Sequence, residues 1–319
     1  MGFSIVGVGN ALPEKRVTNT DLTEIMDTSD EWIRTRTGIE ERRIMTKESL
    51  LDLGTAAANR ALADAKMKAE EIDLLIAATL QGDYVVPSLS SCIAGEIGAR
   101  SDCITFDLGM GCCGFIHALS VADAYLRGGS AKKVLIVSAE ALSRVADWED
   151  RSTAVLFGDA AGAAVLVPDP REVFFDFELK PDVQFLRIDR AADNCPYREP
   201  FAEKNTLKMN GQEVYKFASG AIHDRVVAVL EKAGMTAADI DKLVLHQANI
   251  RIIQSALYKL RIPEEKVPHN IAKYGNTSSA SIPVLLAEMQ AAGQLVRGER
   301  MVLCAFGVGL ASAACTFTY

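Results

Sequence analysis

Three residues that lie far apart in the chain carry side chains suited to thioester chemistry. Cys112 follows a Gly-Met-Gly turn at 109–111, His246 follows a short apolar run, and Asn276 lies in a Tyr-Gly-Asn-Thr-Ser segment. A thiol can act as a nucleophile, an imidazole can hold or donate a proton, and a carboxamide can stabilise a developing negative charge. Each is weak evidence alone, but together they predict an active site where strands end and loops begin.

The spacing after the glycine turn predicts that a helix begins at Cys112. The positive end of a helix dipole favours a thiolate, so we expect the pKa of Cys112 to lie below the usual value of about 8.5. The alternative is a buried packing residue, the commoner role of a free cysteine. Cys113 would point about 100° away around the helix, and we expect it to pack in the core.

His246 and Asn276 also have ordinary alternatives. A single histidine is often structural, and an asparagine before a helix is often its N-cap. The other histidines fit packing within a helix (His117), a helix surface (His223) and a loop (His269). The segment 306–309 would place a glycine-rich loop after a strand, as part of the site or as a simple turn.

Apolar runs and helical periodicity alternate along the whole chain, which predicts an α/β fold with buried sheets. We expect strands at 72–79, 103–108, 133–138, 162–167, 241–246, 300–305 and 312–318. We expect helices near 50–66, 88–98, 112–127, 212–233, 249–260 and 278–292. Four prolines between 170 and 200 indicate an irregular surface excursion over 171–210.

Two pairs of segments indicate an internal duplication. Residues 67–78 resemble 235–246 and residues 133–136 resemble 300–303, at offsets of 168 (235 − 67) and 167 (300 − 133). We therefore predict two halves of related fold, 1–170 with the nucleophile and 171–319 with His246 and Asn276. Two similar halves that share a core could form five alternating layers of helices and sheets.

The composition excludes several classes of protein. The chain has 319 residues, 49% of them hydrophobic and 24% charged, which is typical of a soluble globular protein. Its net charge of −8 disfavours nucleic-acid binding. No apolar run is long enough to span a membrane and no signal peptide is visible. Seven cysteines without metal-ligand spacing predict reduced thiols, no metal site and a cytoplasmic location.

Longer motifs make the chain resemble the thiolase superfamily and, within it, β-ketoacyl-acyl-carrier-protein synthase III. The resemblance covers essentially the whole length in order, with SDEWIRTRTGIEER at 29–42, CCGFIHAL at 112–119, DRSTAVLFGDAAG at 150–162, MNGQEVYK at 209–216, HQANIR at 246–251 and YGNTSSAS at 274–281. It implies a thiolase-like α/β fold with duplicated halves in five α-β-α-β-α layers, a homodimer, and no cofactor beyond acyl-CoA as substrate.

The resemblance also implies a mechanism. Cys112 would take an acyl group from acyl-CoA, and malonyl-acyl carrier protein (malonyl-ACP) would then bind and lose CO₂. His246 and Asn276 would stabilise the resulting enolate, which attacks the acyl group on Cys112. The backbone N–H groups of Cys112 and Val308 would form the oxyanion hole.

Further positions match the substrate-binding residues of that family. The resemblance assigns CoA binding to Trp32, Arg36, Arg151 and Asn249, the acyl pocket to Phe306 and to Val86 of a partner subunit, and a carrier-protein surface to Lys216, Arg251 and Lys259. From the residues alone, Trp32 would be a core residue, Arg151 a surface ion pair and the lysines a solvated helix face.

The chain departs from the family pattern in two places. The segment 306–313 reads FGVGLASA, where the family has three consecutive glycines, so Val308 stands at an oxyanion-loop glycine. Some relatives have a bulky aromatic near position 86, where valine predicts a longer or branched primer.

Four alternatives to an initiating condensing enzyme stay open. They are a synthase-III-like acyltransferase or condensing enzyme of a specialised pathway, a biosynthetic thiolase, a cysteine hydrolase that uses Cys112, His246 and an asparagine, and a non-catalytic partner subunit. A thiolase would need a second cysteine in the 308–311 loop, which this chain lacks.

Overall fold

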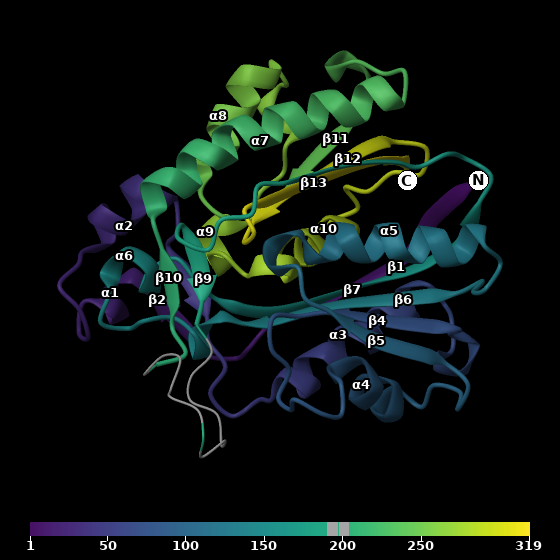
Figure 1. The fold of residues 1–319 in the computed structure, drawn as a ribbon, viewed down its shortest axis with the longest axis horizontal. Helices are drawn as coiled ribbons and strands as arrows, with labels where there is room; N and C mark the ends of the chain where they lie inside the picture. Colours follow the sequence, from purple (N-terminus) through teal and green to yellow (C-terminus); the bar gives the residue numbers. More distant parts are fainter. Residues whose placement is uncertain (190–196, 198–203) are drawn as a thin grey trace.

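The computed structural model describes residues 1–189, 197 and 204–319 and contains two main sheets that lie one above the other (Figure 1). The lower sheet has the strand order β1-β7-β6-β4-β5. Its strands are β1 (Gly2–Ala11), β4 (Leu74–Ala78), β5 (Ile104–Leu108), β6 (Val134–Ala141) and β7 (Asp159–Asp169). Strands β4, β5 and β6 are parallel, so their carboxyl ends meet at one edge of the sheet.

The upper sheet has the strand order β11-β12-β13-β8. It consists of β8 (Phe174–Leu179), β11 (Lys242–Leu245), β12 (Arg300–Gly307) and β13 (Ala311–Thr318). Only β11 and β12 run parallel, and both end close to residues expected in the site. Two small sheets pair β2 (Arg16–Thr18) with β3 (Glu41–Arg43) and β9 (Leu186–Ile188) with β10 (Leu207–Met209).

Helices form three layers around the two sheets (Figure 1). Helices α3 (Leu50–Asp64) and α4 (Leu89–Ile97) cover the outer face of the lower sheet. Helices α5 (Gly114–Arg127) and α10 (Ser281–Ala291) lie between the sheets, and α7 (Gly211–Lys232) and α8 (Ile250–Leu260) cover the upper one. This is the expected five-layered α-β-α-β-α arrangement. The largest apolar cluster fills the space around the central helices.

Short helices complete the fold. They are α1 (Asn19–Leu22), α2 (Asp30–Thr37), α6 (Arg151–Ala154) and α9 (Ile271–Tyr274). The 3₁₀ turns are η1 (Ala69–Glu71), η2 (Gly111–Cys113), η3 (Leu142–Arg144), η4 (Ala237–Asp239), η5 (Glu264–Lys266) and η6 (Ser278–Ala280). No helix among the described residues has the length and apolar character needed to cross a membrane.

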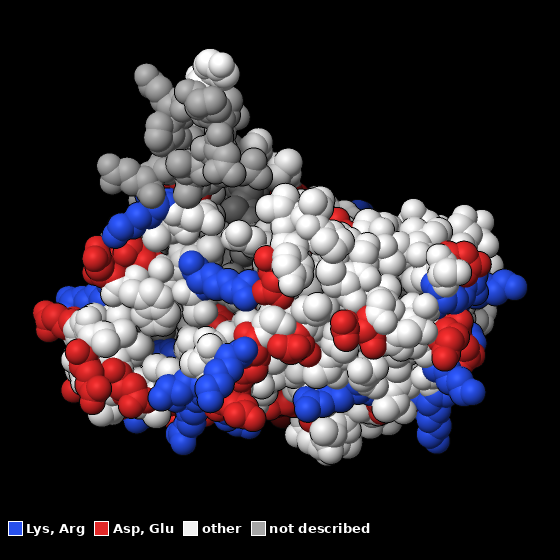
Figure 2. Space-filling model, turned by 90° about the horizontal axis from the view of Figure 1, so that it is seen from below, with Lys and Arg blue, Asp and Glu red and all other residues white. Residues whose placement is uncertain are grey.

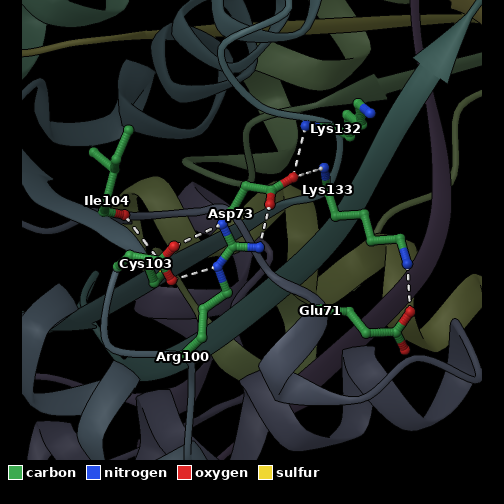
Figure 3. A network of polar contacts seen from close by, with 8 residues as sticks. Glu71, Asp73, Arg100, Cys103, Ile104, Lys132 and Lys133 are labelled. Atoms are coloured by element: carbon green, nitrogen blue, oxygen red, sulfur yellow. Dashed lines mark hydrogen bonds and ion pairs between the residues drawn. The ribbon is translucent and has the colours of Figure 1, made fainter.

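A polar network joins the starts of the parallel strands at the end of the lower sheet opposite the expected site (Figure 3). The Asp73 carboxylate accepts hydrogen bonds from the backbone N–H groups of Lys132 (2.7 Å) and Lys133 (2.9 Å). It also pairs with Arg100 (2.9 Å), which in turn pairs with Asp102. Because these residues precede β4, β5 and β6, the network fixes the register in which the strands enter the sheet.

Both signs of charge are interspersed on the face seen from below (Figure 2). Lys and Arg lie beside Asp and Glu, with wide uncharged areas between them. The described part of this face therefore has no extended surface of one charge.

The expected strands and helices are present with ends that differ by a few residues, and two predictions are wrong. First, residues 171–210 are not wholly irregular, because β8 joins the upper sheet beside β13 and β9 pairs with β10. Pro170 and Pro181 lie outside β8, so they do not interrupt its hydrogen bonding. Cys195, Pro196 and Pro200 lie outside the described residues.

The second wrong prediction concerns Cys112. The α-helix begins at Gly114, and Cys112 lies in the preceding 3₁₀ turn η2. Strand β1 was not predicted at all. The division at 170 into two related halves stays a prediction, although β1 and β4–β7 precede that residue and β8 and β11–β13 follow it.

Candidate active site

A cavity of about 1140 Å³ lies where the carboxyl ends of strands from both sheets meet. Cys112, His246 and Asn276 all line it, as do Phe306 and Val308. The fold therefore brings the predicted trio to one cavity, from η2, from the end of β11 and from the loop after α9. Both halves of the chain contribute to the walls.

The Cys112 thiol is held in a less ionising environment than the sequence predicted. The pKa of Cys112 is raised to about 12: burial is the main cause, the Ser278 hydroxyl lowers the pKa, and the nearby Glu140 carboxyl raises it by a smaller amount. The expected lowering of this pKa is wrong because loss of hydration outweighs the dipole of α5. A thiol with so high a pKa is protonated at neutral pH, and it would need a proton acceptor in order to act as a nucleophile.

Cys113 is fully buried, as predicted for a packing residue. Its side chain has no exposed surface and its thiol lies 3.6 Å from the Ala311 carbonyl oxygen. The two adjacent cysteines therefore have separate roles, one at the cavity and one in the core.

Gly307 lies so close to the nucleophile that no larger residue fits. A Cβ atom there would lie 2.8 Å from Cys112 Cβ and 3.2 Å from Cys112 Sγ. Gly111 has a positive φ of 49°, and a Cβ atom on it would lie 2.5 Å from Cγ1 of Val308. The Val308 side chain therefore packs over the turn that carries Cys112.

His246 is buried and neutral. Burial lowers its pKa to about 3, and its exposed fraction is 2%. Its Nδ1 lies 2.7 Å from Ser281 Oγ, which also accepts the N–H of Gln247 at 3.4 Å. The Ser281 hydroxyl can therefore donate its proton to Nδ1, which leaves Nε2 protonated and able to donate a hydrogen bond. The ring of Phe306 packs edge-on against the His246 imidazole, with 5.4 Å between the two ring centres.

Asn276 is oriented by its own loop. Its Oδ1 accepts the backbone N–H of Ser278 at 2.9 Å, so its amide N–H₂ group remains the available donor. The residue does not cap a long helix, since η6 begins at Ser278. His246 and Asn276 thus present two neutral donors at the cavity.

The predicted CoA-binding residues are gathered at one part of the cavity. The guanidinium groups of Arg36 and Arg151 lie 4.7 Å and 5.0 Å from the centre of the Trp32 ring. Asn249 caps α8 by accepting the N–H of Arg251 and donates to the backbone carbonyl of Arg36 (3.0 Å). Trp32, Arg36 and Asn249 line the cavity, whereas Arg151 reaches Trp32 from α6.

The other predicted positions lie on the surface. Val86 is 81% exposed and does not line the cavity of its own chain. Lys216 lies on α7, and Arg251 and Lys259 lie on α8, all exposed. Lys259 Nζ donates to the Ser219 carbonyl at 2.7 Å, which ties α8 to α7.

The sequence analysis missed four residues that shape this site: Glu140, Gly307, Ser278 and Ser281. Ser278 and Ser281 fall within the motif at 274–281, and Gly307 falls within the glycine-rich loop, so the signal was present for these three. Glu140 ends a strand without any motif. Among the residues described, no cluster of His, Cys, Asp and Glu could hold a metal ion, and six cysteines are free.

Comparisons with known proteins point to one family. The family models described as "3-Oxoacyl-[acyl-carrier-protein (ACP)] synthase III" and its C-terminal part match residues 106–182 and 230–319. A β-ketoacyl-[acyl-carrier-protein] synthase III from Geobacillus kaustophilus is 43% identical, covering 97% of this chain and 96% of its own. Another from Aquifex aeolicus is 42% identical over 100% of both chains. A crystal structure of the 3-oxoacyl-[acyl-carrier-protein] synthase III from Aquifex aeolicus superposes with a TM-score of 0.92 and covers 100% of both chains.

Proposed function

The chain belongs to the 3-oxoacyl-[acyl-carrier-protein] synthase III family, and on this premise we propose that Cys112, His246 and Asn276 carry out its reaction. The enzyme is an acyltransferase of thiolase-like fold that forms a β-ketoacyl-ACP in the condensation that initiates fatty-acid synthesis. Its substrates are acyl-CoA and malonyl-ACP. The alternative of a specialised pathway is not favoured, because relatives 41–43% identical over nearly the full length carry the name of the initiating enzyme.

In the first half-reaction the Cys112 sulfur attacks the thioester carbonyl of acyl-CoA. The backbone N–H groups of Cys112 and Val308 stabilise the tetrahedral oxyanion, and CoA leaves as its thiol. Gly307 supports this step because its missing side chain leaves room beside Sγ. Trp32, Arg36 and Arg151 bind the adenine end of CoA by stacking, while Asn249 holds the Arg36 backbone in place.

In the second half-reaction malonyl-ACP loses CO₂ in the same cavity. The electrons of the broken C–C bond form an enolate, whose oxygen receives hydrogen bonds from His246 Nε2–H and from the Asn276 amide. The enolate carbon then attacks the acyl group on Cys112, and the Cys112 thiolate leaves. Neutral donors suit this task, because they stabilise the charge only as it develops.

We place the macromolecular contacts on the surface around this cavity. Lys216, Arg251 and Lys259 attract the acidic carrier protein. A second copy of the chain covers the free edge of β5 and inserts Val86 into the acyl pocket beside Phe306. The exposure of Ile104, Val85 and Val86 supports this homodimer. We assign the enzyme to the cytoplasm and propose that it needs no cofactor or metal and binds neither nucleic acid nor a membrane.

The observation that carries this proposal is the single cavity that contains Cys112, His246 and Asn276. Intact-protein mass spectrometry after incubation with acyl-CoAs from acetyl to decanoyl tests it. We expect one acyl adduct on the wild type and on Cys113→Ser, and none on Cys112→Ser. An adduct that persists in Cys112→Ser, or no adduct with any acyl-CoA, would overturn the assignment.

A further inference from the structure

Glu140 is a buried carboxyl group at the active cavity that the reaction described above does not use. It lies near the end of β6, its exposed fraction is 1%, and it lines the same cavity as Cys112. Within the part of the chain that the structure describes, no Lys or Arg pairs with it. A carboxyl group without a cation is costly to bury, so its retention beside the nucleophile calls for a role.

The hydrogen bonds around Glu140 can accommodate both of its protonation states. Oε2 accepts the N–H of Leu80 at 3.0 Å, and Oε1 accepts the hydroxyls of Ser278 (3.0 Å) and Ser279 (2.7 Å). Ser279 Oγ also lies 3.2 Å from the carbonyl oxygen of Ala78. Its single proton can point to the carboxylate or turn to this carbonyl, which would free Oγ to accept a proton from a neutral Glu140.

Ser278 connects this carboxyl group to the nucleophile. Its hydroxyl donates to Glu140 at 3.0 Å, and η6, which carries Ser278, packs against η2, which carries Cys112. Cys112, Ser278 and Glu140 line the same cavity, and an oxygen lone pair of Ser278 remains free to accept a proton. The Ser278 backbone has a positive φ of 51°, which is strained for a residue other than glycine. The Asn276 side chain stabilises this conformation by accepting the Ser278 N–H. The strained backbone at Ser278 therefore places its hydroxyl group between Cys112 and Glu140.

The surroundings favour proton exchange at Glu140. Burial raises its pKa to about 7, against the hydrogen bonds that lower it. Titratable groups near Glu140 include Cys112 on η2, Asp159 on β7 and His246 at the cavity wall. Helices α3 and α5 also pack against β6 and carry Asp52, Arg60, Asp64, His117, Asp123 and Arg127. Asp159 is held by Ser143 and by the Met45 N–H, and His246 is neutral. The strand partner of Glu140 on β7, Ala160, carries no charge.

Resting on the proposed function, we propose that Ser278 and Glu140 form a proton relay for the acylation of Cys112. As sulfur attacks the acyl-CoA carbonyl, the S–H proton passes to Ser278 Oγ and the Ser278 proton passes to the Glu140 carboxylate. When the C–S bond to CoA breaks, the relay runs in reverse and protonates the leaving sulfur. No proton is gained or lost overall. In this relay Ser278 exchanges a proton with the reacting sulfur, and Glu140 acts through Ser278 as a positioning residue.

Single-turnover acylation of Cys112 with acyl-CoA, followed by mass spectrometry from pH 5 to pH 9, tests this relay. The wild-type rate should rise with pH through an inflection near 7, because only ionised Glu140 accepts the proton. Glu140→Gln and Ser278→Ala should each lower the limiting rate about 100-fold and abolish the inflection, with an unchanged KM for acyl-CoA. Ser279→Ala is the matched control, since its hydroxyl also binds Glu140. It should keep the limiting rate and an inflection, which should move to higher pH because a hydrogen bond that lowers the Glu140 pKa is lost.

The outcomes separate this proposal from the function itself. Wild-type acylation on Cys112 tests the function, whereas the variants test only the relay. Glu140→Gln that acylates at the wild-type rate or retains the inflection would overturn the relay. So would a Ser279→Ala profile identical to that of Ser278→Ala. Circular dichroism confirms folding of each variant, and if Glu140→Gln does not fold, the contrast between the two serine variants decides.

Discussion

At the scale of single residues, the site separates a nucleophile from two neutral donors. The raised pKa of Cys112 keeps its thiol protonated at neutral pH. His246 and Asn276 each have one polar atom hydrogen-bonded to a neighbouring serine and a second polar atom free to bind a substrate. This division of labour assigns acylation to one set of groups and decarboxylation to another. It makes the two half-reactions separable by mutation.

Alanine at either donor should stop the second half-reaction, and alanine at His246 should spare the first. His246→Ala or Asn276→Ala should lower the rate of condensation about 100- to 1000-fold, the usual cost of removing one donor to a developing oxyanion. The acyl-enzyme should still form within a few-fold of the wild-type rate in His246→Ala, whereas Asn276→Ala also removes the acceptor of the Ser278 N–H and should slow acylation. His223→Ala, an exposed histidine on α7, is the control and should retain both steps.

The neutral state of His246 also determines the pH dependence of condensation. Its pKa in the folded protein is lowered to about 3, so it gains no proton between pH 8 and pH 5. Condensation from a preformed acyl-enzyme should therefore show no loss from histidine protonation in that range. An inflection near pH 6.5 that disappears in His246→Gln would contradict a neutral donor.

Gly307 tests how closely the oxyanion loop approaches the nucleophile. Gly307→Ala would place a methyl group 2.8 Å from Cys112 Cβ, and we expect acylation to fall at least 100-fold as Sγ moves. Gly220→Ala is the matched control, because a Cβ atom in that turn of α7 meets nothing within 4 Å. That variant should be fully active and more stable by about 0.5–1 kcal/mol in thermal unfolding. Normal acylation by Gly307→Ala would mean that the loop is displaced during catalysis.

The sequence predicted which residues meet at the cavity better than it predicted the electrostatics of the cavity. Cys112, His246 and Asn276 were recognisable from residue type and position, and the longer motifs supported them. The pKa of Cys112 was predicted in the wrong direction, because burial is a property of the assembled cavity and no local pattern reports it. Glu140 was missed for the same reason, since its partners Ser278 and Leu80 lie 138 and 60 residues away.

At the scale of elements, the parallel strands have the cavity at their carboxyl ends and a network of structural hydrogen bonds at their amino ends. The Asp73 network connects the starts of β4, β5 and β6, and the cavity lies beyond their carboxyl ends (Figure 3). A change at the network should therefore affect stability without affecting the reaction.

Asp73→Ala leaves the N–H groups of Lys132 and Lys133 without their acceptor. We expect a loss of about 1–3 kcal/mol in the free energy of unfolding, measured with urea, and an unchanged acylation rate in the folded enzyme. Asp102→Ala removes only an exposed partner of Arg100 and should leave stability nearly unchanged. A selective loss of acylation in Asp73→Ala would show that the two ends of the sheet are coupled.

Helices and strands with a strongly periodic pattern of apolar residues were predictable from the sequence. Strands that depend on pairing with distant strands were not. Helices α3, α7 and α8 and strands β4, β6 and β12 follow their apolar patterns closely. Strand β8 alternates aromatic and acidic residues on the edge of a sheet, and β9 and β10 are three residues each, so their identity depends on distant partners. Helix α5 begins at Gly114, two residues after the predicted start at Cys112, because residues 111–113 form the 3₁₀ turn η2.

At the scale of the whole molecule, β1 and β5 are the two edge strands of the lower sheet, and β1 is mostly buried whereas β5 is partly exposed. Among the described residues β5 pairs only with β4, and Ile104 on it is 40% exposed. Exposed strand edges invite pairing with another chain. The nearby loop with Val85 and Val86, 91% and 81% exposed, adds apolar surface.

We therefore expect a homodimer with β5 at its interface. Light scattering after size-exclusion chromatography should give twice the chain mass of 34.4 kDa for the wild type. Ile104→Lys should shift the protein towards the monomer, whereas Ile25→Lys, at an isoleucine 61% exposed elsewhere, should not. A wild-type monomer, or a dimer unaffected by Ile104→Lys, would place the interface elsewhere.

The central claim is that one cavity performs both half-reactions in sequence on Cys112. The direct measurement is to isolate the acyl-enzyme, add malonyl-ACP with a labelled free carboxyl group, and quantify all products. The account predicts that each acyl group leaving Cys112 yields one molecule of CO₂ and one of β-ketoacyl-ACP. Release of the acyl group as a free acid, or an adduct that malonyl-ACP does not discharge, would contradict it.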